Sequence, residues 1–219
     1  MSGGMLVEGP GDADFIIGFL KKIGKHNVAV FPPKHLGGSG NGINNVLAFI
    51  PVLINQLRTG VIDKAAIVVD ADYTGINGGF LFRRKQITDV LAANGYVIPM
   101  NSPAHRGCGE VFFSSGGQEP IGLFIMPDHQ SDGMLENFLK TLVVNPPYSA
   151  VLEHASVTVG ALPNVLFDQR LHTAKAEIGT FLAWQRRPPS YVSACLLDNI
   201  FDTSAAGAQD FVKWMNQAL

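Results

Sequence analysis

The stretch Ala65-Ala66-Ile67-Val68-Val69-Asp70-Ala71-Asp72 decides the fold. Its continuous apolar run, rich in β-branched residues, is typical of a strand that is buried on both faces. Such strands belong to parallel sheets covered by helices, and their carboxyl ends carry the polar residues that form sites. Asp70 and Asp72 follow the run directly, so the stretch predicts an α/β sheet with a site at its edge.

Strands and helices are expected to alternate on both sides of this stretch. Apolar runs bounded by Gly, Pro or charged residues predict the strands, and apolar residues spaced by three or four predict the helices. The expected strands cover 5–7, 28–31, 65–69, 95–100, 111–114 and 121–126. The expected helices cover a segment from Asp12 or Asp14 to about 23, and the segments 43–59, 83–93 and 132–143. This alternation predicts a mostly parallel sheet sandwiched by helices, with right-handed crossovers.

The alternation ends at Asn145-Pro146-Pro147. We therefore expect an α/β domain over residues 1–145 and a largely helical carboxyl-terminal extension over residues 146–219. Two helices are predicted in the extension, at 172–186 and 207–218, the second amphipathic. The extension is expected to pack on the first domain or to mediate assembly into a homo-oligomer.

Composition limits the classes of function. The chain has 219 residues, of which 47% are apolar and 16% charged, and its net charge is −2. This balance gives no overall attraction for a polyanion, so any contact with nucleic acid requires a local basic site or metal ions. No secretory signal and no apolar run long enough to span a bilayer is evident, which predicts a cytoplasmic protein with no membrane contact.

Acidic residues follow three of the predicted strands. Glu8 follows the first strand, Asp70 and Asp72 follow the third, and Asp128 follows the strand at 121–126. The carboxyl ends of parallel strands share one edge of the sheet, so these side chains are expected to converge. Carboxylates brought together repel one another unless a cation such as Mg²⁺ neutralises them. The Asp-x-Asp spacing suits one ion, because alternate residues of an extended chain point to the same side. The alternative for Asp70 and Asp72 is a pair of aspartates that cap turns.

Two further features concern phosphate. Lys34, Arg83 and Arg84 follow a strand or begin a helix and are candidate contacts to a phosphate backbone, although adjacent charges also suit a solvated helix face. The glycine-rich loop 37–42 opens a helix, where backbone amides can hold phosphate. The loop lacks the Lys-Ser/Thr ending of a nucleotide-binding P-loop.

Two groups of residues resemble a known family. Leu6-Val7-Glu8-Gly9, with Asp12 and then Asp70-Ala71-Asp72, resembles the glutamate and Asp-x-Asp motifs of the Toprim domain found in primases, topoisomerases and overcoming-lysogenization-defect nucleases. This likeness covers roughly the first 145 residues. The stretch 124–138 and the tail 175–185 resemble a Toprim-like family of uncharacterised prokaryotic proteins, a likeness that extends over nearly the whole chain.

The Toprim resemblance implies a set of roles for the acidic residues. Glu8 would act as general acid or base, or as a metal ligand, while Asp70 and Asp72 hold Mg²⁺ or Mn²⁺. Asp128 is a candidate fourth ligand. Candidates for a second ion, or for shaping the site, are Asp12, Asp132 and Glu136. Asp132 and Glu136 are four apart and are expected to share a helix face, although acidic residues also stabilise a helix N-terminus without binding metal.

These expectations favour a divalent-metal-dependent nuclease or a related phosphoryl-transfer module that acts on nucleic acid through a local site. One alternative is a non-catalytic Toprim-like module that binds or regulates together with a partner protein. Another is a nucleotide-binding α/β protein that uses the glycine-rich loop. Nucleases of the overcoming-lysogenization-defect type are joined to an ATPase, and this sequence has no Walker A motif, so an ATPase partner would be a separate polypeptide.

Overall fold

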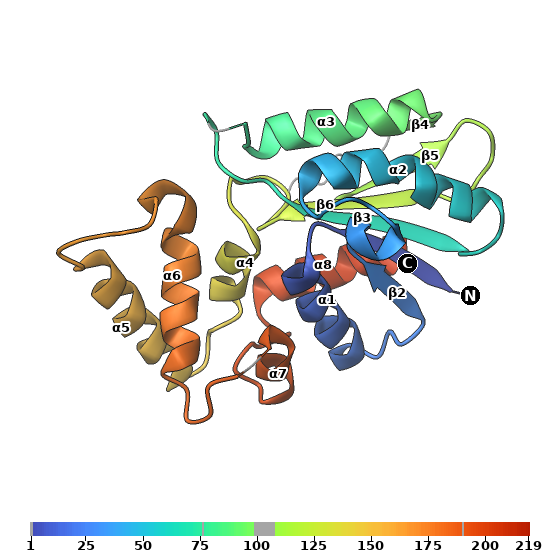
Figure 1. Ribbon diagram of the computed structural model, residues 1–219. Coiled ribbons are helices and arrows are strands. Elements are labelled where there is room, and N and C mark those ends of the chain that lie inside the picture. The colour runs from blue at the N-terminus through green and yellow to red at the C-terminus, as the bar shows by residue number, and fades with distance from the viewer. Residues whose placement is uncertain (1, 76, 99–107, 190) are drawn as a thin grey trace.

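A six-stranded sheet forms the centre of the protein in a computed structural model, which describes residues 2–75, 77–98, 108–189 and 191–219 (Figure 1). The strands lie in the order β2-β1-β3-β6-β5-β4. Their bounds are β1 Gly3–Val7, β2 Val28–Phe31, β3 Lys64–Asp70, β4 Tyr96–Val97, β5 Glu110–Ser114 and β6 Ile121–Met126. The four strands β2, β1, β3 and β6 run parallel, whereas β5 and β4 are antiparallel to their neighbours.

Helices cover both faces of the sheet. Their bounds are α1 Pro10–Lys22, α2 Ile43–Arg58, α3 Phe80–Ala93, α4 Leu135–Thr141, α5 Tyr148–Gly160, α6 Gln169–Ala183, α7 Val192–Leu197 and α8 Ala206–Ala218, with a 3₁₀ turn η1 at Pro33–Leu36. Figure 1 shows α2 and α3 over one face and α1 and α8 over the other, while α5 and α6 pack as a pair beside the sheet. The predicted α/β class, with a mostly parallel sheet between helices and further helices toward the C-terminus, is confirmed.

The central strands are buried on both faces, as the sequence predicted. Alternate residues of β3 enter different cores: Ala66 and Val68 face the α1 and α8 side, and Ile67 faces the α2 and α3 side. In β6, Phe124 joins the first core and Leu123 the second. Neither face of the central strands is left for solvent, and their polar side chains are therefore confined to the strand ends.

Some element boundaries differ from the prediction. Helix α1 begins at Pro10, before both expected caps, because proline is well suited to the first helical position. Helix α3 begins at Phe80 and α4 only at Leu135, three residues later in the chain than the predicted start at 132. The strand expected at 95–100 is represented by β4, and residues 99 and 100 lie outside the described part of the chain. Among the described residues, no helix has both the length and the apolar character needed to cross a bilayer.

The carboxyl-terminal helix α8 packs directly against the sheet. Trp214 is fully buried and its indole Nε1 donates to the carbonyl of Glu110, 3.1 Å away. Gly122 of β6 makes this approach possible, since a Cβ at this position would overlap the Ala218 side chain and lie 3.1 Å from the Trp214 ring. Residues 206–218 therefore share a hydrophobic core with the sheet.

We predict that Gly122→Ala lowers the free energy of unfolding by about 1–3 kcal/mol, because the added methyl group forces α8 away from β6. The matched control is Gly179→Ala in α6, where no described atom lies within 4 Å of the added Cβ. This change should raise stability by about 0.5–1 kcal/mol, because glycine disfavours a helix interior. Urea denaturation measures both effects, and wild-type stability in Gly122→Ala would contradict the proposed packing.

Candidate carboxylate site

The site lies where the connections of the sheet change direction. Strand β1 leads into α1 on one face, whereas its neighbour β3 leads to α3 on the other face. A crevice opens outside the carboxyl ends of two such strands, and this is the usual ligand position in open α/β sheets. Glu8 follows β1 directly and Asp70 is the last residue of β3, so both stand at this switch point.

Glu8 and Asp70 are joined through the backbone. The amide of Asp70 donates to Glu8 Oε1 at 3.0 Å. The Asp70 carboxylate in turn accepts from the amide of Leu135, the first residue of α4, with 2.8 Å between Oδ1 and N. Asp70 thus connects the ends of β1, β3 and α4. The predicted convergence of Glu8 with Asp70 is observed.

Three carboxyl groups of the site have raised pKa values. Burial, and then the charge of Asp12, raise the pKa of Glu8 to about 7. Burial is also the main reason that the pKa of Asp12 is raised, to about 6. Backbone hydrogen bonds lower this pKa, whereas the charge of Glu136 raises it further. The pKa of Asp70 lies well above its ordinary value because of burial and the charges of Asp12 and Glu8.

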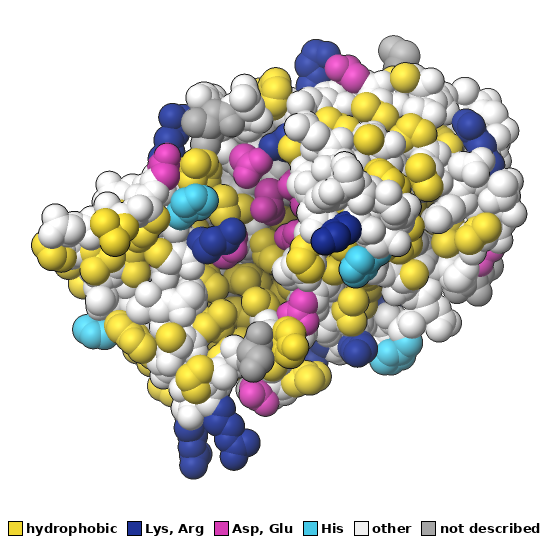
Figure 2. Space-filling model, viewed as in Figure 1, with side chains coloured by type: hydrophobic (Ala, Val, Ile, Leu, Met, Phe, Trp, Pro, Cys, Tyr) yellow, Lys and Arg dark blue, Asp and Glu magenta, His cyan; other side chains and the backbone are white. Residues whose placement is uncertain are grey.

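We call these groups the carboxylate cluster: Glu8, Asp12, Asp70, Asp72 and Glu136. Figure 2 shows acidic side chains gathered in a hollow between the helical pair and the body of the sheet. Crowded, desolvated carboxylates favour the protonated state or a neutralising cation. The cluster is therefore a candidate for either acid–base chemistry or metal binding.

Asp72 joins the cluster in a different way from the one expected. The prediction placed Asp70 and Asp72 on the same side of an extended chain, but β3 ends at Asp70 and Asp72 has a left-handed φ of 58°. The backbone of Asp72 pairs with Gly133. Its carboxylate meets the guanidinium of Arg83, with 2.5 Å between Oδ2 and Nη2. The same-side argument is thus wrong at Asp72, because the chain turns there.

Arg83 is part of the scaffold of the site. Its side chain is only 2% exposed, and besides Asp72 it donates to the carbonyl of Asp70 at 3.1 Å and to Gln86. Arg83 was predicted as a candidate contact to a phosphate backbone or as part of a solvated helix face, and its buried, paired side chain suits neither. A sequence signal for this burial exists, since Arg83, Ile87 and Leu91 recur at four-residue spacing and all three are buried.

Asp132 and Asp128 are used locally. Asp132 precedes α4 and accepts from the amides of Thr74 and Phe80, so the expected face shared with Glu136 on one helix is not formed. These bonds hold the loop between β3 and α3. Asp128 accepts from the amides of Gln130 and Ser131 at 3.1 and 2.7 Å and so caps the turn after β6.

The remaining basic candidates differ in their surroundings. Arg84 forms a forked pair with Glu110, with distances of 2.6 to 3.0 Å, and is occupied there. Lys34 is exposed in η1, which directly follows β2. The glycine-rich loop ends beside the site, where the amide of Gly42 donates to the Glu8 carbonyl at 2.9 Å.

Sequence reasoning missed two supports of the site. Helix α6 reaches the cluster: Lys175 Nζ lies 3.6 Å from Glu136 Oε1, and Arg170 donates to the carbonyl of Thr74. No local pattern marks these partners, since each contact joins segments far apart in the chain.

The second support is the buried His129, whose Nδ1 accepts from the Ile125 amide at 3.0 Å and whose Nε2 lies 3.3 Å from Glu110 Oε2. Burial raises the pKa of Glu110, but contacts with His129 and Arg84 outweigh burial, and the pKa is lowered. This arrangement braces the turn that follows β6.

The donor chemistry of the cluster suits a hard divalent cation, because its free atoms are carboxylate oxygens. In the part of the chain that the structure describes, however, no three Asp, Glu, His or Cys side chains form a ready-made ligand group. One oxygen of Asp70 is engaged by a backbone amide and one oxygen of Asp72 by Arg83.

Fold and site together define an α/β protein with an acidic cluster at the switch point of a mostly parallel sheet. The chain belongs to the family described as "Protein of unknown function (DUF3226)", whose model matches residues 3–219. No curated protein and no solved structure matches the chain.

Replacing Arg83 by Met tests its role in the scaffold. We predict a loss of about 1–3 kcal/mol in the free energy of unfolding, because the half-buried Asp72 carboxylate and the Asp70 carbonyl lose their donor. Lys85→Met removes a neighbouring exposed pair with Asp89 and should change stability by less than about 0.5 kcal/mol. Equal effects in chemical denaturation would refute a structural role for Arg83.

Glu8→Gln should stabilise the metal-free protein in a pH-dependent way. The folded-state pKa of about 7 exceeds the ordinary value of 4.5, so the native state binds this proton more tightly than the unfolded state does. The contribution of Glu8 to wild-type stability therefore falls as pH rises from about 4.5 to 7, whereas glutamine imitates the protonated form throughout. Thermal melts in a chelator should show a difference in melting temperature between Glu8→Gln and the wild type that grows over this pH range. The exposed Glu153→Gln should show no such difference. A difference that does not change with pH would argue against a raised pKa at Glu8.

Proposed function

We propose that this protein is a divalent-metal-dependent phosphodiester hydrolase that acts on nucleic acid, with Glu8, Asp70 and Asp72 at its centre. The observation that carries the proposal is the burial of Asp70 beside Glu8 and Asp12, which keeps its pKa well above the ordinary range. Such perturbed groups in a crevice at a sheet switch point are typical of functional sites. The resemblance of the residues around Glu8 and Asp70 to Toprim motifs supports the same chemistry.

Each residue has a distinct task in this proposal. Asp70 and Asp72 would hold Mg²⁺ or Mn²⁺, which supplies charge stabilisation at the phosphate when bound. Glu8, whose pKa of about 7 is close to neutral pH, can hold or release a proton beside the scissile phosphate. Arg83 keeps Asp72 in place through its guanidinium. Asp12 and Glu136 add negative charge next to Asp70.

Two aspects of the cellular setting belong to the same proposal. The setting is cytoplasmic, in keeping with the two free cysteines among the described residues. A separate ATPase polypeptide is the partner that this proposal allows for.

A non-catalytic binding module is the second candidate. It is favoured by the absence, within the described residues, of a ready-made metal-ligand group and by the engagement of Asp72 with Arg83. In this case the cluster would keep its structural bonds, and any catalytic activity would reside in a partner. Ion binding without cleavage is the behaviour that separates this candidate from the hydrolase.

The proposal predicts cleavage of at least one single- or double-stranded DNA or RNA substrate in the presence of Mg²⁺ or Mn²⁺, and no cleavage in a chelator. Glu8→Gln should slow the reaction by about 10²- to 10⁴-fold, the range for loss of general acid–base catalysis. Asp70→Asn should abolish the reaction. The asparagine side chain keeps one oxygen that can accept from the Leu135 amide, as Asp70 does. Asp89→Asn, on the exposed side of α3, is the matched control and should retain full activity.

Thermal melts complete this test. In the hydrolase, Mg²⁺ should raise the melting temperature of the wild-type protein but not of Asp70→Asn. Stabilisation by Mg²⁺ with no cleavage of any substrate would support the non-catalytic candidate. Cleavage that survives in Asp70→Asn would place the activity outside the carboxylate cluster and overturn the proposal.

A further inference from the structure

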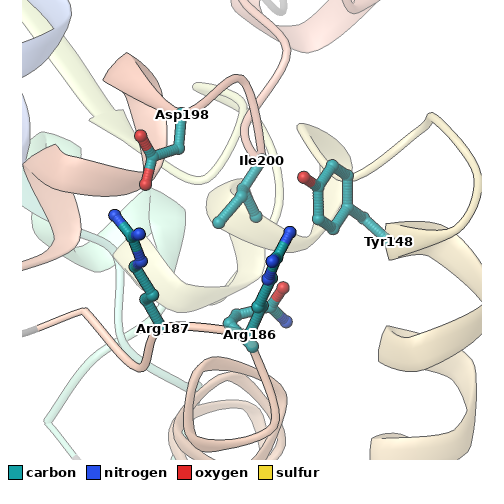
Figure 3. A pocket seen from close by; sticks show the side chains of 6 residues that line it. Tyr148, Arg186, Arg187, Asp198 and Ile200 are labelled. Carbon is teal, nitrogen blue, oxygen red and sulfur yellow. The ribbon is translucent and has the colours of Figure 1, made fainter.

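A second cavity lies away from the carboxylate cluster, where three carboxyl-terminal segments meet. Its volume is about 350 Å³, near the lower end of the range for small-molecule sites. Tyr148 at the start of α5 lines it, together with a segment just after α6 and residues that follow α7. The full lining consists of Tyr148, Gln185, Arg186, Arg187, Asp198 and Ile200, and we call it the arginine pocket (Figure 3).

Two guanidinium groups dominate the charge of this pocket. Arg186 and Arg187 are exposed, and among the described residues neither forms an ion pair or a hydrogen bond. Figure 3 shows Arg187 directed toward Asp198 and Arg186 extended toward Tyr148. Their donors are therefore available, and the lining carries a net charge of +1 with Asp198 included. Guanidinium groups match the oxygens of phosphate, to which they donate paired hydrogen bonds.

The rest of the lining offers a place for a planar ring. Tyr148 is half-buried and Ile200 is buried, so this side of the pocket is apolar. The side chain of Gln185 is fixed by donation from Nε2 to the Phe181 carbonyl at 2.6 Å. Asp198 and the Gln185 Oε1 can accept hydrogen bonds from ring amino groups.

We propose that the arginine pocket binds a nucleotide, with its phosphate on Arg186 and Arg187 and its base against Tyr148. The ligand is either a free mononucleotide or the phosphorylated end of a nucleic-acid strand, since both present the same phosphate and ring. The pocket is a separate site. From Lys175 at the carboxylate cluster, α6 runs eight residues, or about 12 Å, to its end at Ala183, and Gln185 lies beyond that end.

Calorimetric titration of the full-length protein in a chelator tests this inference independently of the proposed hydrolase. The probes are adenosine monophosphate, inorganic phosphate, and a tetranucleotide with or without a 5′-phosphate. Chelation removes any contribution of a metal ion at the carboxylate cluster. We expect saturable binding of the monophosphate, weaker binding of inorganic phosphate, and preference for the phosphorylated tetranucleotide only if strand ends are the ligand.

Four variants locate the binding. Arg186→Gln with Arg187→Gln should weaken nucleotide affinity at least about tenfold, because the charge-assisted hydrogen bonds are lost. A control that removes two exposed cations elsewhere, Arg58→Gln with Lys85→Gln, should change affinity less than about twofold. Asp198→Asn should tighten the binding of inorganic phosphate severalfold by removing repulsion. Tyr148→Leu should weaken binding of the monophosphate but not of inorganic phosphate.

The outcomes separate the two sites. Unchanged affinity in the double arginine variant, with its fold verified by circular dichroism, would overturn the inference, as would the absence of saturable binding to every probe. Equal effects of Tyr148→Leu on phosphate and nucleotide would overturn the assignment of a base to the pocket. Nucleotide binding that persists in Asp70→Asn supports the inference even if no nuclease activity is found.

Discussion

The structure depends on the place of Asp70 at the end of a strand that is buried on both faces. Its amide donates to Glu8 and its carboxylate accepts from the first amide of α4. A carboxylate near a helix N-terminus is stabilised by the unpaired amides there. The loss of water on burial, and then the charges of Asp12 and Glu8, act in the opposite direction and outweigh this stabilisation, since the pKa of Asp70 is raised. The molecule thus holds an acid where its ionised form is disfavoured.

The surroundings keep this arrangement in place. Asp132 ties the loop between β3 and α3, and Arg83 ties Asp72 to the carbonyl of Asp70. His129 and Glu110 brace the turn after β6, and Trp214 connects that brace to α8. These contacts come from segments on both sides of residue 145. A site that carries unfavourable charge has to be held by contacts elsewhere, because its own groups repel one another.

The fold class could be predicted because it rests on local patterns. The apolar runs at 65–69 and 121–126 predicted the parallel strands. The acidic residues that follow the strands predicted that Glu8 and Asp70 meet. The direction of β5 could not be predicted, since a short apolar run has the same appearance in parallel and antiparallel pairs. Helix α5 was missed because its Ser, Thr and Val residues are weak helix formers, so that packing against α6 stabilises it.

The details of the site depend on backbone geometry and on distant partners. The left-handed turn at Asp72 has no glycine to mark it, and it changes which carboxylates face each other. Arg83 was interpreted as part of a charged surface because Arg84 and Lys85 follow it, although its helix turns it inward with Ile87. Lys175 and Arg170 come from α6, about a hundred residues further along the chain than the loop that Arg170 contacts. Local sequence patterns contain no information on such pairings.

The distribution of charge constrains how a polyanion could approach. The carboxylate cluster repels phosphate, and the net charge of −2 provides no compensation at long range. Cations lie around the cluster instead of within its acidic centre, with Lys175 beside Glu136 and the exposed Lys34 after β2. Contact between a phosphodiester and Asp70 therefore requires either a cation that enters with the substrate or before it, or protonation of the cluster. When the carboxylates are ionised and no cation is bound, the acidic centre repels the group on which it is proposed to act.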